Sequence, residues 1–170
     1  MKTRVLLALM LCLILPSGFI WAQKRAKAQA DANMYGYNYE IEQTSVAATT
    51  GQVNLIVYCY SSKPAVAEDM TKKCAVHACI FKGVPECANK PGSSKKPLLM
   101  DPQLEAQHAE FFSKFFEGEY LRFVTITSST PKITRMKKDY KVGKAVMVNY
   151  ALLRKYLEDA GVIRSLTTGF

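Results

Sequence analysis

The segment Val53-Asn54-Leu55-Ile56-Val57-Tyr58-Cys59-Tyr60 decides the fold of this chain. Every second residue, from Val53 to Cys59, is apolar, and such alternation in a run rich in β-branched and aromatic residues is typical of a half-buried strand. Residues 35–46 alternate in the same way, and the turn signal Thr49-Thr50-Gly51 separates the two runs. We therefore predict that the two runs pair as a β-hairpin.

The rest of the chain gives three helices and two strands. Each predicted helix begins at a proline or a capping residue and stops at a glycine. For the first helix, a serine just before Pro64 is expected to cap the free amides. The predicted helices are residues 64–82, 101–117 and 150–160, the predicted strands are residues 120–127 and 140–148, and residues 84–100 and 128–139 are a loop and a basic turn.

The resulting order, β-β-α-α-β-β-α, indicates an α+β fold. Hairpin connections favour antiparallel pairing, and helices with one apolar stripe each pack on a single sheet face. We expect a two-layer sandwich with a mainly antiparallel four-stranded sheet and the helices on one face. Residues 35–170 form this single domain, and residues 23–34 read as a flexible polar leader.

The first 22 residues have the pattern of a cleavable secretory signal. Lys2 and Arg4 precede an apolar run from Val5 to Leu15, and Pro16 ends the run shortly before the expected cleavage after Ala22. A run of about 11 residues is too short to cross a bilayer as a helix. We therefore expect an exported protein that has no transmembrane span after cleavage.

The charge of the chain is strongly basic. It carries 23 basic and 14 acidic residues, and the predicted signal holds two of the basic ones and no acidic one. Removal of the signal leaves 148 residues with a net charge of +7, a length that suits one domain with one core. A basic balance favours anionic neighbours, and outside the cytosol these are lipid phosphates or acidic glycans rather than nucleic acid.

Cationic residues gather around the last predicted hairpin. They are Lys132, Arg135, Lys137, Lys138, Lys141 and Lys144, and only Asp139 offsets them. The cluster predicts a binding surface for an anionic partner, and the alternative is an ordinary solvated turn. Because it lacks interleaved aromatic residues of the kind that stack on bases, nucleic acid is not expected to bind there.

Four cysteines remain after signal removal, and an oxidising compartment allows them to form disulfides. Cys59 shares a strand face with Val57, and Cys74 lies on the helix stripe expected to pack there. Cys79 falls on the outer side of that helix, near the loop that holds Cys87. The expected pairs are Cys59–Cys74 and Cys79–Cys87, and the alternative is that the buried cysteines are free thiols in the core.

His77 and His108 each fall within the apolar stripe of a predicted helix. If both helices cover the same sheet, the imidazoles approach Cys59 or Cys74, and two His with one or two Cys can bind zinc. The spacing lacks both Cys-x-x-Cys and His-x-x-x-His, so this metal site remains an alternative. No phosphate loop, nucleophile elbow or metalloprotease motif is present, and we expect no catalytic residue and no cofactor.

Two stretches and the helices after them resemble a known family. They are Val53–Ser62, followed by small residues at Ala67, Cys74, Ala75 and Ala78, and Lys141–Val148, followed by Leu152 and Leu153. Over about half its length the chain is similar to the small envelope domains of LPP20-type bacterial lipoproteins and of the N-terminal part of flagellar assembly protein T. It departs from them by lacking a lipobox cysteine and by inserting residues 84–117. The resemblance implies a non-catalytic scaffold or accessory part of an envelope assembly and assigns no functional residue.

We therefore expect an exported bacterial protein without enzymatic activity, in the periplasm, at the outer membrane or outside the cell. It is expected to bind a protein partner of the envelope, or an anionic lipid or glycan surface, through its exposed sheet face or its basic hairpin. The alternative function is a small metal-dependent or Cys–His hydrolase that uses His77, His108 and a nearby cysteine.

Overall fold

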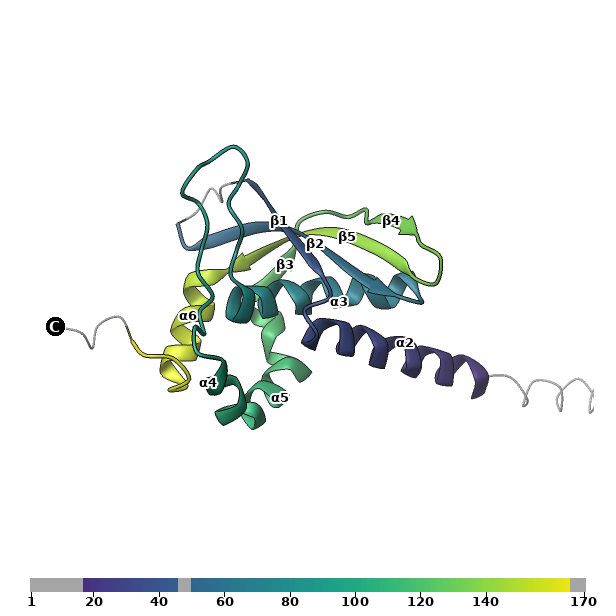
Figure 1. Ribbon diagram of the computed structural model, residues 1–170, viewed down its shortest axis with the longest axis horizontal. Helices are drawn as coiled ribbons and strands as arrows, with labels where there is room; N and C mark the ends of the chain where they lie inside the picture. The colour runs from purple at the N-terminus through teal and green to yellow at the C-terminus, as the bar shows by residue number, and fades with distance from the viewer. Residues whose placement is uncertain (1–16, 46–49, 166–170) are drawn as a thin grey trace, which may run out of the picture.

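The computed structural model describes residues 17–45 and 50–165 (Figure 1). It is an α+β fold of two layers, in which helices cover one face of an antiparallel sheet, as the sequence predicted. The sheet has five strands rather than the predicted four, because the basic turn expected at residues 128–139 contains a short strand.

The strands are β1 (Glu40–Ser45), β2 (Gln52–Ser61), β3 (Val124–Ile126), β4 (Lys132–Arg135) and β5 (Tyr140–Asn149). β5 is central, with β2 along its full length on one side and β3 and β4 in succession on the other. β1 and β2 form the predicted antiparallel hairpin. Buried and half-buried residues alternate along β2, and Leu55 lies opposite the buried Val146 of β5, so these residues form the face that the helices cover.

Helix α3 (Pro64–His77) covers the buried sheet face and continues as a π-helical turn, η1 (Ala78–Lys82). Pro64 lies in the first turn, but the residue before the helix is Lys63, which makes no side-chain cap bond, so the predicted serine cap is wrong. Gly83 ends the segment with φ of +84°, a conformation that glycine adopts without strain. A Cβ at Gly83 would lie 2.7 Å from the carbonyl oxygen of Lys95, because the loop after the helix folds back against it.

The second predicted helix is two helices, α4 (Pro102–Gln107) and α5 (Ala109–Glu117). Asp101 caps α4 as predicted, since its Oδ1 accepts a hydrogen bond from the amide of Gln103 at 2.9 Å. The break occurs at His108, whose backbone is not helical at φ −107° and ψ 24°. The chain changes direction there, and α5 buries the phenylalanines Phe112, Phe115 and Phe116.

The strand predicted at residues 120–127 is shorter than expected. A 3₁₀ turn, η2 (Glu119–Phe123), precedes β3. Phe123 is buried, and its ring centroid lies 5.9 Å from that of Phe115 and 5.1 Å from that of Tyr156. The packing of the Phe123 ring into the aromatic cluster stabilises η2, so β3 begins only at Val124.

Helix α2 (Ser17–Tyr35) occupies the region expected to be a flexible leader at residues 23–34. Ala26, Ala30 and Met34 recur every four residues and are buried, and Lys73 Nζ of α3 lies 2.9 Å from Asp31 Oδ1. The prediction of a flexible leader is therefore wrong, because this narrow buried stripe is enough to pack the helix against α3. The chain turns at Gly36–Asn38, so β1 begins at Glu40 and not at residue 35.

The n-region and apolar run of the predicted signal fall in residues 1–16, outside the described residues. Residues 17–22 form the first part of α2, so the predicted cleavage point after Ala22 lies within a helix. None of the described helices is long and apolar enough to cross a membrane.

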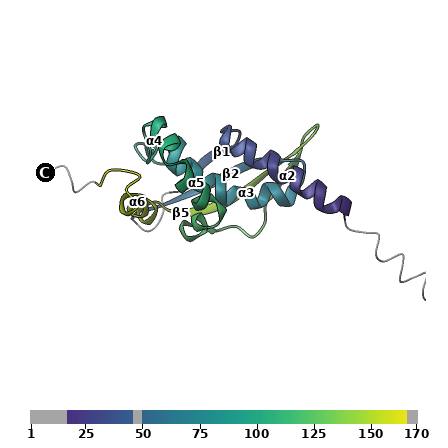
Figure 2. The ribbon, with the colours of Figure 1, turned by 90° about the horizontal axis from the view of Figure 1, so that it is seen from below.

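Helix α6 (Tyr150–Asp159) agrees with its prediction. Asn149 Oδ1 accepts a hydrogen bond from the amide of Leu152 at 3.1 Å, and Gly161 follows the helix with φ of +70°. Seen from below, α4 and α6 lie toward one end of the molecule, while α2 extends toward the other (Figure 2). The end that holds α4 and α6 and the end that holds α2 are therefore formed by different elements.

Candidate functional site

Strand β4 and the residues that join it to β5, together called the β4–β5 turn, carry four of the predicted cations. Lys132, Arg135, Lys137 and Lys138 are all exposed, and none has an ion-pair partner within the described part of the chain. β4 pairs only with β5, so it is an edge strand whose side chains reach solvent. The predicted basic hairpin is thus present and its positive charge is not neutralised by the fold.

Two members of the predicted cluster do not belong to this surface. Lys141 Nζ lies 2.7 Å from Glu40 Oε2 on β1, and it also sits 4.6 Å from the ring centroid of Tyr58. Hydrogen bonds from Lys141 and then from Tyr60 lower the pKa of Glu40. Lys141 is therefore part of an ordered ion pair on the open face of the sheet.

Lys144 points the other way, into the helix layer. It is buried opposite Val57 of β2, and its ammonium is paired with the carboxylate of Glu68 on α3. The prediction that Lys144 contributes to an anion-binding surface is wrong. The residue lies on the buried face of β5 because side chains alternate along a strand, and its neighbours Val142 and Val146 on that face are also buried.

Exposed apolar side chains lie among the free cations of the turn. Ile133 is 51 % exposed and Met136 is 49 % exposed. Ile133 follows Lys132 on the edge strand β4, and Met136 follows Arg135 directly after the strand ends. Cations interleaved with exposed apolar groups are typical of surfaces that meet a membrane interface.

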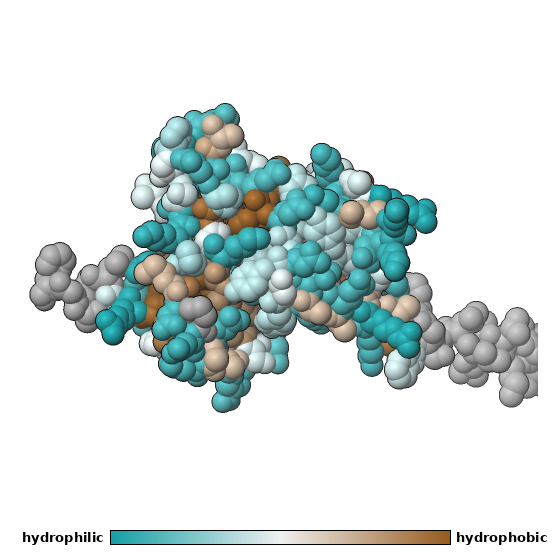
Figure 3. Space-filling model, viewed as in Figure 1, coloured by the Kyte–Doolittle hydropathy of each residue, from teal (hydrophilic) through white to brown (hydrophobic). Residues whose placement is uncertain are grey.

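Helix α2 adds two more cations beside the turn. Gln29 Nε2 donates a hydrogen bond to Asp139 Oδ1 at 3.2 Å, and Ser61 Oγ donates to the carbonyl of Ala26 at 3.3 Å, next to the start of β5. The exposed Lys24 and Arg25 precede Ala26 on this helix. We call Lys24, Arg25, Lys132, Arg135, Lys137 and Lys138 the basic end, and Figure 3 shows that hydrophilic residues cover much of this end of the molecule.

The structure brings only part of the predicted cysteine pairing together. All four thiols are free and buried. Burial, and then a hydrogen bond with Cys74, raise the pKa of Cys59 well above its ordinary value, so these two thiols are in contact. Cys79 is not on the outer side of its helix as predicted, since it is fully buried in η1, where the amide of Leu98 donates to its carbonyl oxygen.

His77 is enclosed by aromatic rings rather than by metal ligands. Its side chain is fully buried, and its Nδ1 lies 2.9 Å from the hydroxyl oxygen of Tyr39. The rings whose centroids lie within 6.1 Å of the imidazole belong to Tyr35, Tyr37, Tyr39, Phe81 and Phe116. Burial, and then the charges of Lys73 and Lys82, lower the pKa of His77 to about 4, so the imidazole is neutral at physiological pH.

His108 lies elsewhere, at the break between α4 and α5, where it lines a groove together with residues of α6. The two imidazoles therefore do not share a site. Within residues 17–45 and 50–165, no three His, Cys, Asp or Glu side chains come together as a possible metal site. The alternative metal site, predicted from His77, His108, Cys74 and Cys59, is therefore not supported by the positions of these residues.

Two features of the site were not predicted from the sequence. The carboxylates that neutralise Lys141 and Lys144 come from β1 and α3, more than seventy positions away in the chain. The contribution of α2 to the basic end was missed because its helix has only a weak apolar stripe. The buried spacing of Ala26, Ala30 and Met34 is the one signal that could have revealed it.

Comparisons with protein-family models, with curated proteins and with solved structures find no match for this chain. The resemblance to small envelope domains stays a prediction.

Proposed function

We propose that this chain is an exported, non-catalytic protein of the bacterial envelope that attaches to an anionic membrane surface through its basic end. The observation that carries the proposal is the β4–β5 turn, where four exposed cations that have no ion-pair partner among the described residues flank the exposed Ile133 and Met136. Each cation near an anionic lipid surface contributes about 1 kcal/mol of attraction, and exposed apolar groups insert at the headgroup boundary.

The position of the predicted signal also favours an orientation in which the basic end faces the membrane. The predicted signal ends within α2, and Lys24 and Arg25, which follow the predicted cleavage point, lie close to the β4–β5 turn. A chain that has just left a translocation channel would have this end nearest the membrane. The resemblance to LPP20-type domains adds the expectation of an accessory role in an envelope assembly.

The first experiment tests export. The protein is expressed with its own N-terminus and isolated from the periplasmic fraction, and its intact mass is measured. A mass that corresponds to a chain starting at Gln23 supports the proposed signal, whereas retention of the full chain in the cytosol would overturn the proposed location.

The second experiment tests membrane attachment. The exported form is sedimented with vesicles of phosphatidylcholine alone or with phosphatidylglycerol added. We expect binding only to the anionic vesicles, with a loss in high salt because exposed charges are screened. Replacing Lys132, Arg135, Lys137 and Lys138 by Gln should weaken binding at least tenfold, since about 1 kcal/mol is lost per cation.

A matched control removes the same charge elsewhere. The control variant replaces four lysines that lie outside the basic end by Gln. They are Lys72, Lys90, Lys114 and Lys155. It should retain most of the binding. Equal losses in both variants would mean that net charge alone drives binding, and that result would contradict a defined docking surface.

A further inference from the structure

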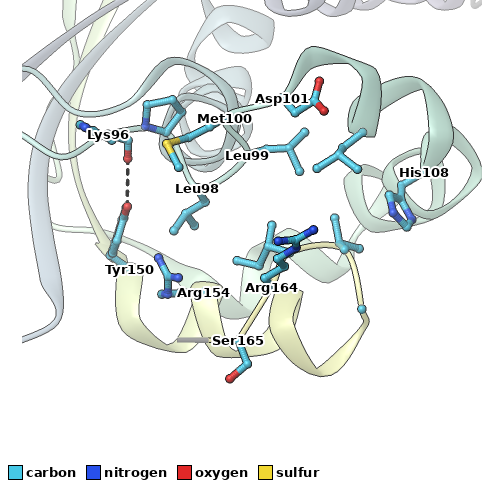
Figure 4. Close-up of a pocket in the computed structure, with 15 residues that line it drawn as sticks. Lys96, Leu98, Leu99, Met100, Asp101, His108, Tyr150, Arg154, Arg164 and Ser165 are labelled. Carbon is cyan, nitrogen blue, oxygen red and sulfur yellow. Dashed lines mark hydrogen bonds between the residues drawn. The ribbon is translucent and has the colours of Figure 1, made fainter. Parts of the chain in front are cut away.

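A groove lies at the opposite end of the molecule from the basic end, between the segment 96–101, α4, α6 and the residues after α6 (Figure 4). Its volume is about 860 Å³. Small-molecule sites in proteins occupy roughly 300–1,000 Å³, so the groove has the size of a ligand site. No part of the proposed membrane attachment uses it.

The walls of the groove are fixed by hydrogen bonds between distant segments. The hydroxyl of Tyr150 on α6 donates to the carbonyl of Lys96 at 3.0 Å. The amides of Leu98 and Leu99 donate to the carbonyls of Cys79 and Ile80 at 3.1 and 2.9 Å. The segment 96–99 is thus tied both to α6 and to η1, and the groove is preformed.

The floor of the groove is apolar. Leu98, Leu99 and Val162 are buried beneath it, and Leu104 and Ile163 are half-buried along it. An aliphatic chain laid on this floor would remove the remaining exposed surface of Leu104 and Ile163 from water. Burial of apolar surface of this kind contributes about 25 cal/mol per Å².

Most of the charged side chains that line the groove are positive. Lys96, Arg154 and Arg164 line it, and the guanidinium of Arg164 lies between α6 and the leucine side chains (Figure 4). The lining carboxylate, from Asp101, is engaged in capping α4 through the amide of Gln103. Glu158 accepts a hydrogen bond from Nε of Arg154 at 2.8 Å.

The guanidinium of Arg154 has five N–H donors, so the bond to Glu158 leaves four of them for a ligand. An apolar floor beside guanidinium groups complements a molecule with an aliphatic tail and an anionic head. A planar carboxylate matches the fork geometry of guanidinium. We propose that the groove binds an amphipathic carboxylate, with its acyl chain on the floor and its head group at Arg154 and Arg164.

The test uses isothermal titration of the exported protein with decanoate. Decanol and decyltrimethylammonium provide the same chain without charge or with the opposite charge, and acetate provides the head group alone. We expect saturable binding of decanoate at one site and at least tenfold weaker binding of the other three probes. Equal binding of decanol would reduce the groove to a non-selective apolar surface and overturn the proposal.

Variants locate the site. Arg164→Gln and Ile163→Ser should each weaken decanoate binding at least tenfold, while Lys155→Gln, on α6 but outside the groove, should leave it unchanged. The fourfold variant of the β4–β5 turn should also bind decanoate normally, so failure of the membrane proposal does not affect this result. Unchanged binding in both groove variants would place the ligand elsewhere and contradict the proposal.

Discussion

At the residue scale, the most unusual side chain is His77. It is fully buried, one nitrogen contacts the hydroxyl of Tyr39, and Nε2 has no hydrogen-bond partner in the described part of the chain. A protonated imidazole in this aromatic cluster would be an unpaired buried charge. The neutral form is therefore favoured in the folded protein, and the titration of His77 is coupled to folding.

The coupling predicts acid sensitivity with a definite sign. The pKa of His77 is lowered from 6.5 to about 4 in the folded protein, so between these values the unfolded chain binds more protons. The stability is complete above pH 6.5 and is lost as the pH falls toward 4, by about 2–3 kcal/mol at most. Urea unfolding at pH 7.5 and at pH 4.5 measures this loss.

A substitution separates this effect from the titration of carboxylates. His77→Phe should reduce the stability difference between the two pH values, because phenylalanine cannot take up a proton. His108→Gln, at the half-exposed break between α4 and α5, serves as the control and should keep the full difference. An unchanged difference in His77→Phe would show that other groups cause the acid sensitivity.

Gly143 illustrates how one residue of β5 adapts the open sheet face. A Cβ at this position would lie 2.5 Å from Cε1 of Tyr58 on β2. The glycine therefore makes room for the tyrosine ring, which in turn supports the ammonium of Lys141 at 4.6 Å. The aromatic ring covers a position that would otherwise expose strand backbone.

At the element scale, α3 is joined to the sheet by one buried ion pair in addition to apolar packing. The side chain of Lys144 is 7 % exposed and that of Glu68 is 33 % exposed. Removing Glu68 leaves a buried ammonium without a counter-charge, whereas removing Lys144 leaves a carboxylate that is one-third exposed and can be solvated by water. The two partners should therefore respond differently to substitution.

We expect Glu68→Gln to lower the free energy of unfolding by about 1–3 kcal/mol, because Lys144 stays buried without a counter-charge. Lys144→Met should be close to neutral, since the thioether chain fills the same space. Urea unfolding of both variants measures the contrast. A larger loss in Lys144→Met than in Glu68→Gln would contradict the account.

The contact between β2 and α3 also includes the thiols of Cys59 and Cys74. Cys87, in contrast, is buried beneath its loop outside the main core cluster. Oxidation with diamide should therefore link Cys59 to Cys74, seen as the loss of two hydrogens in the intact mass. Cys59→Ser should abolish this change and Cys87→Ser should preserve it; a link that contains Cys87 would contradict the geometry.

At the scale of the whole molecule, α2 is part of the domain. Met34 is fully buried, and Ala26 and Ala30 pack on the same side of the helix. A chain that starts at Gln23 retains all three residues and should be as stable as the longer chain. Met34→Ala should cost about 2–5 kcal/mol through the cavity that it leaves.

Thermal and urea unfolding check these two expectations, with the exposed Ala28→Gly as a control for helix propensity, which costs only about 1 kcal/mol. A Met34→Ala variant as stable as the parent chain would mean that α2 does not contribute to the core. Unfolding of the chain that starts at Gln23 shows whether the predicted cleavage after Ala22 leaves the folded unit intact.

The sequence by itself determined the elements with strong local signals. The alternation in β2, the glycines that end η1 and α6, and the Asn149 cap depend on neighbouring residues only, so they could be predicted. The α+β class and the single helix-covered face followed from the order of these elements. The exposed cations of the β4–β5 turn were also found from sequence, since they are consecutive or nearly so.

Only the tertiary structure decided which charged and polar groups are available. Lys141 and Lys144 look like their neighbours in sequence, but Glu40 and Glu68 neutralise them from distant elements. The separation of His77 from His108 and the groove beside α6 likewise depend on contacts between segments far apart in the chain. Such contacts leave no periodic trace in the sequence, because each residue meets its partner only after the backbone has folded.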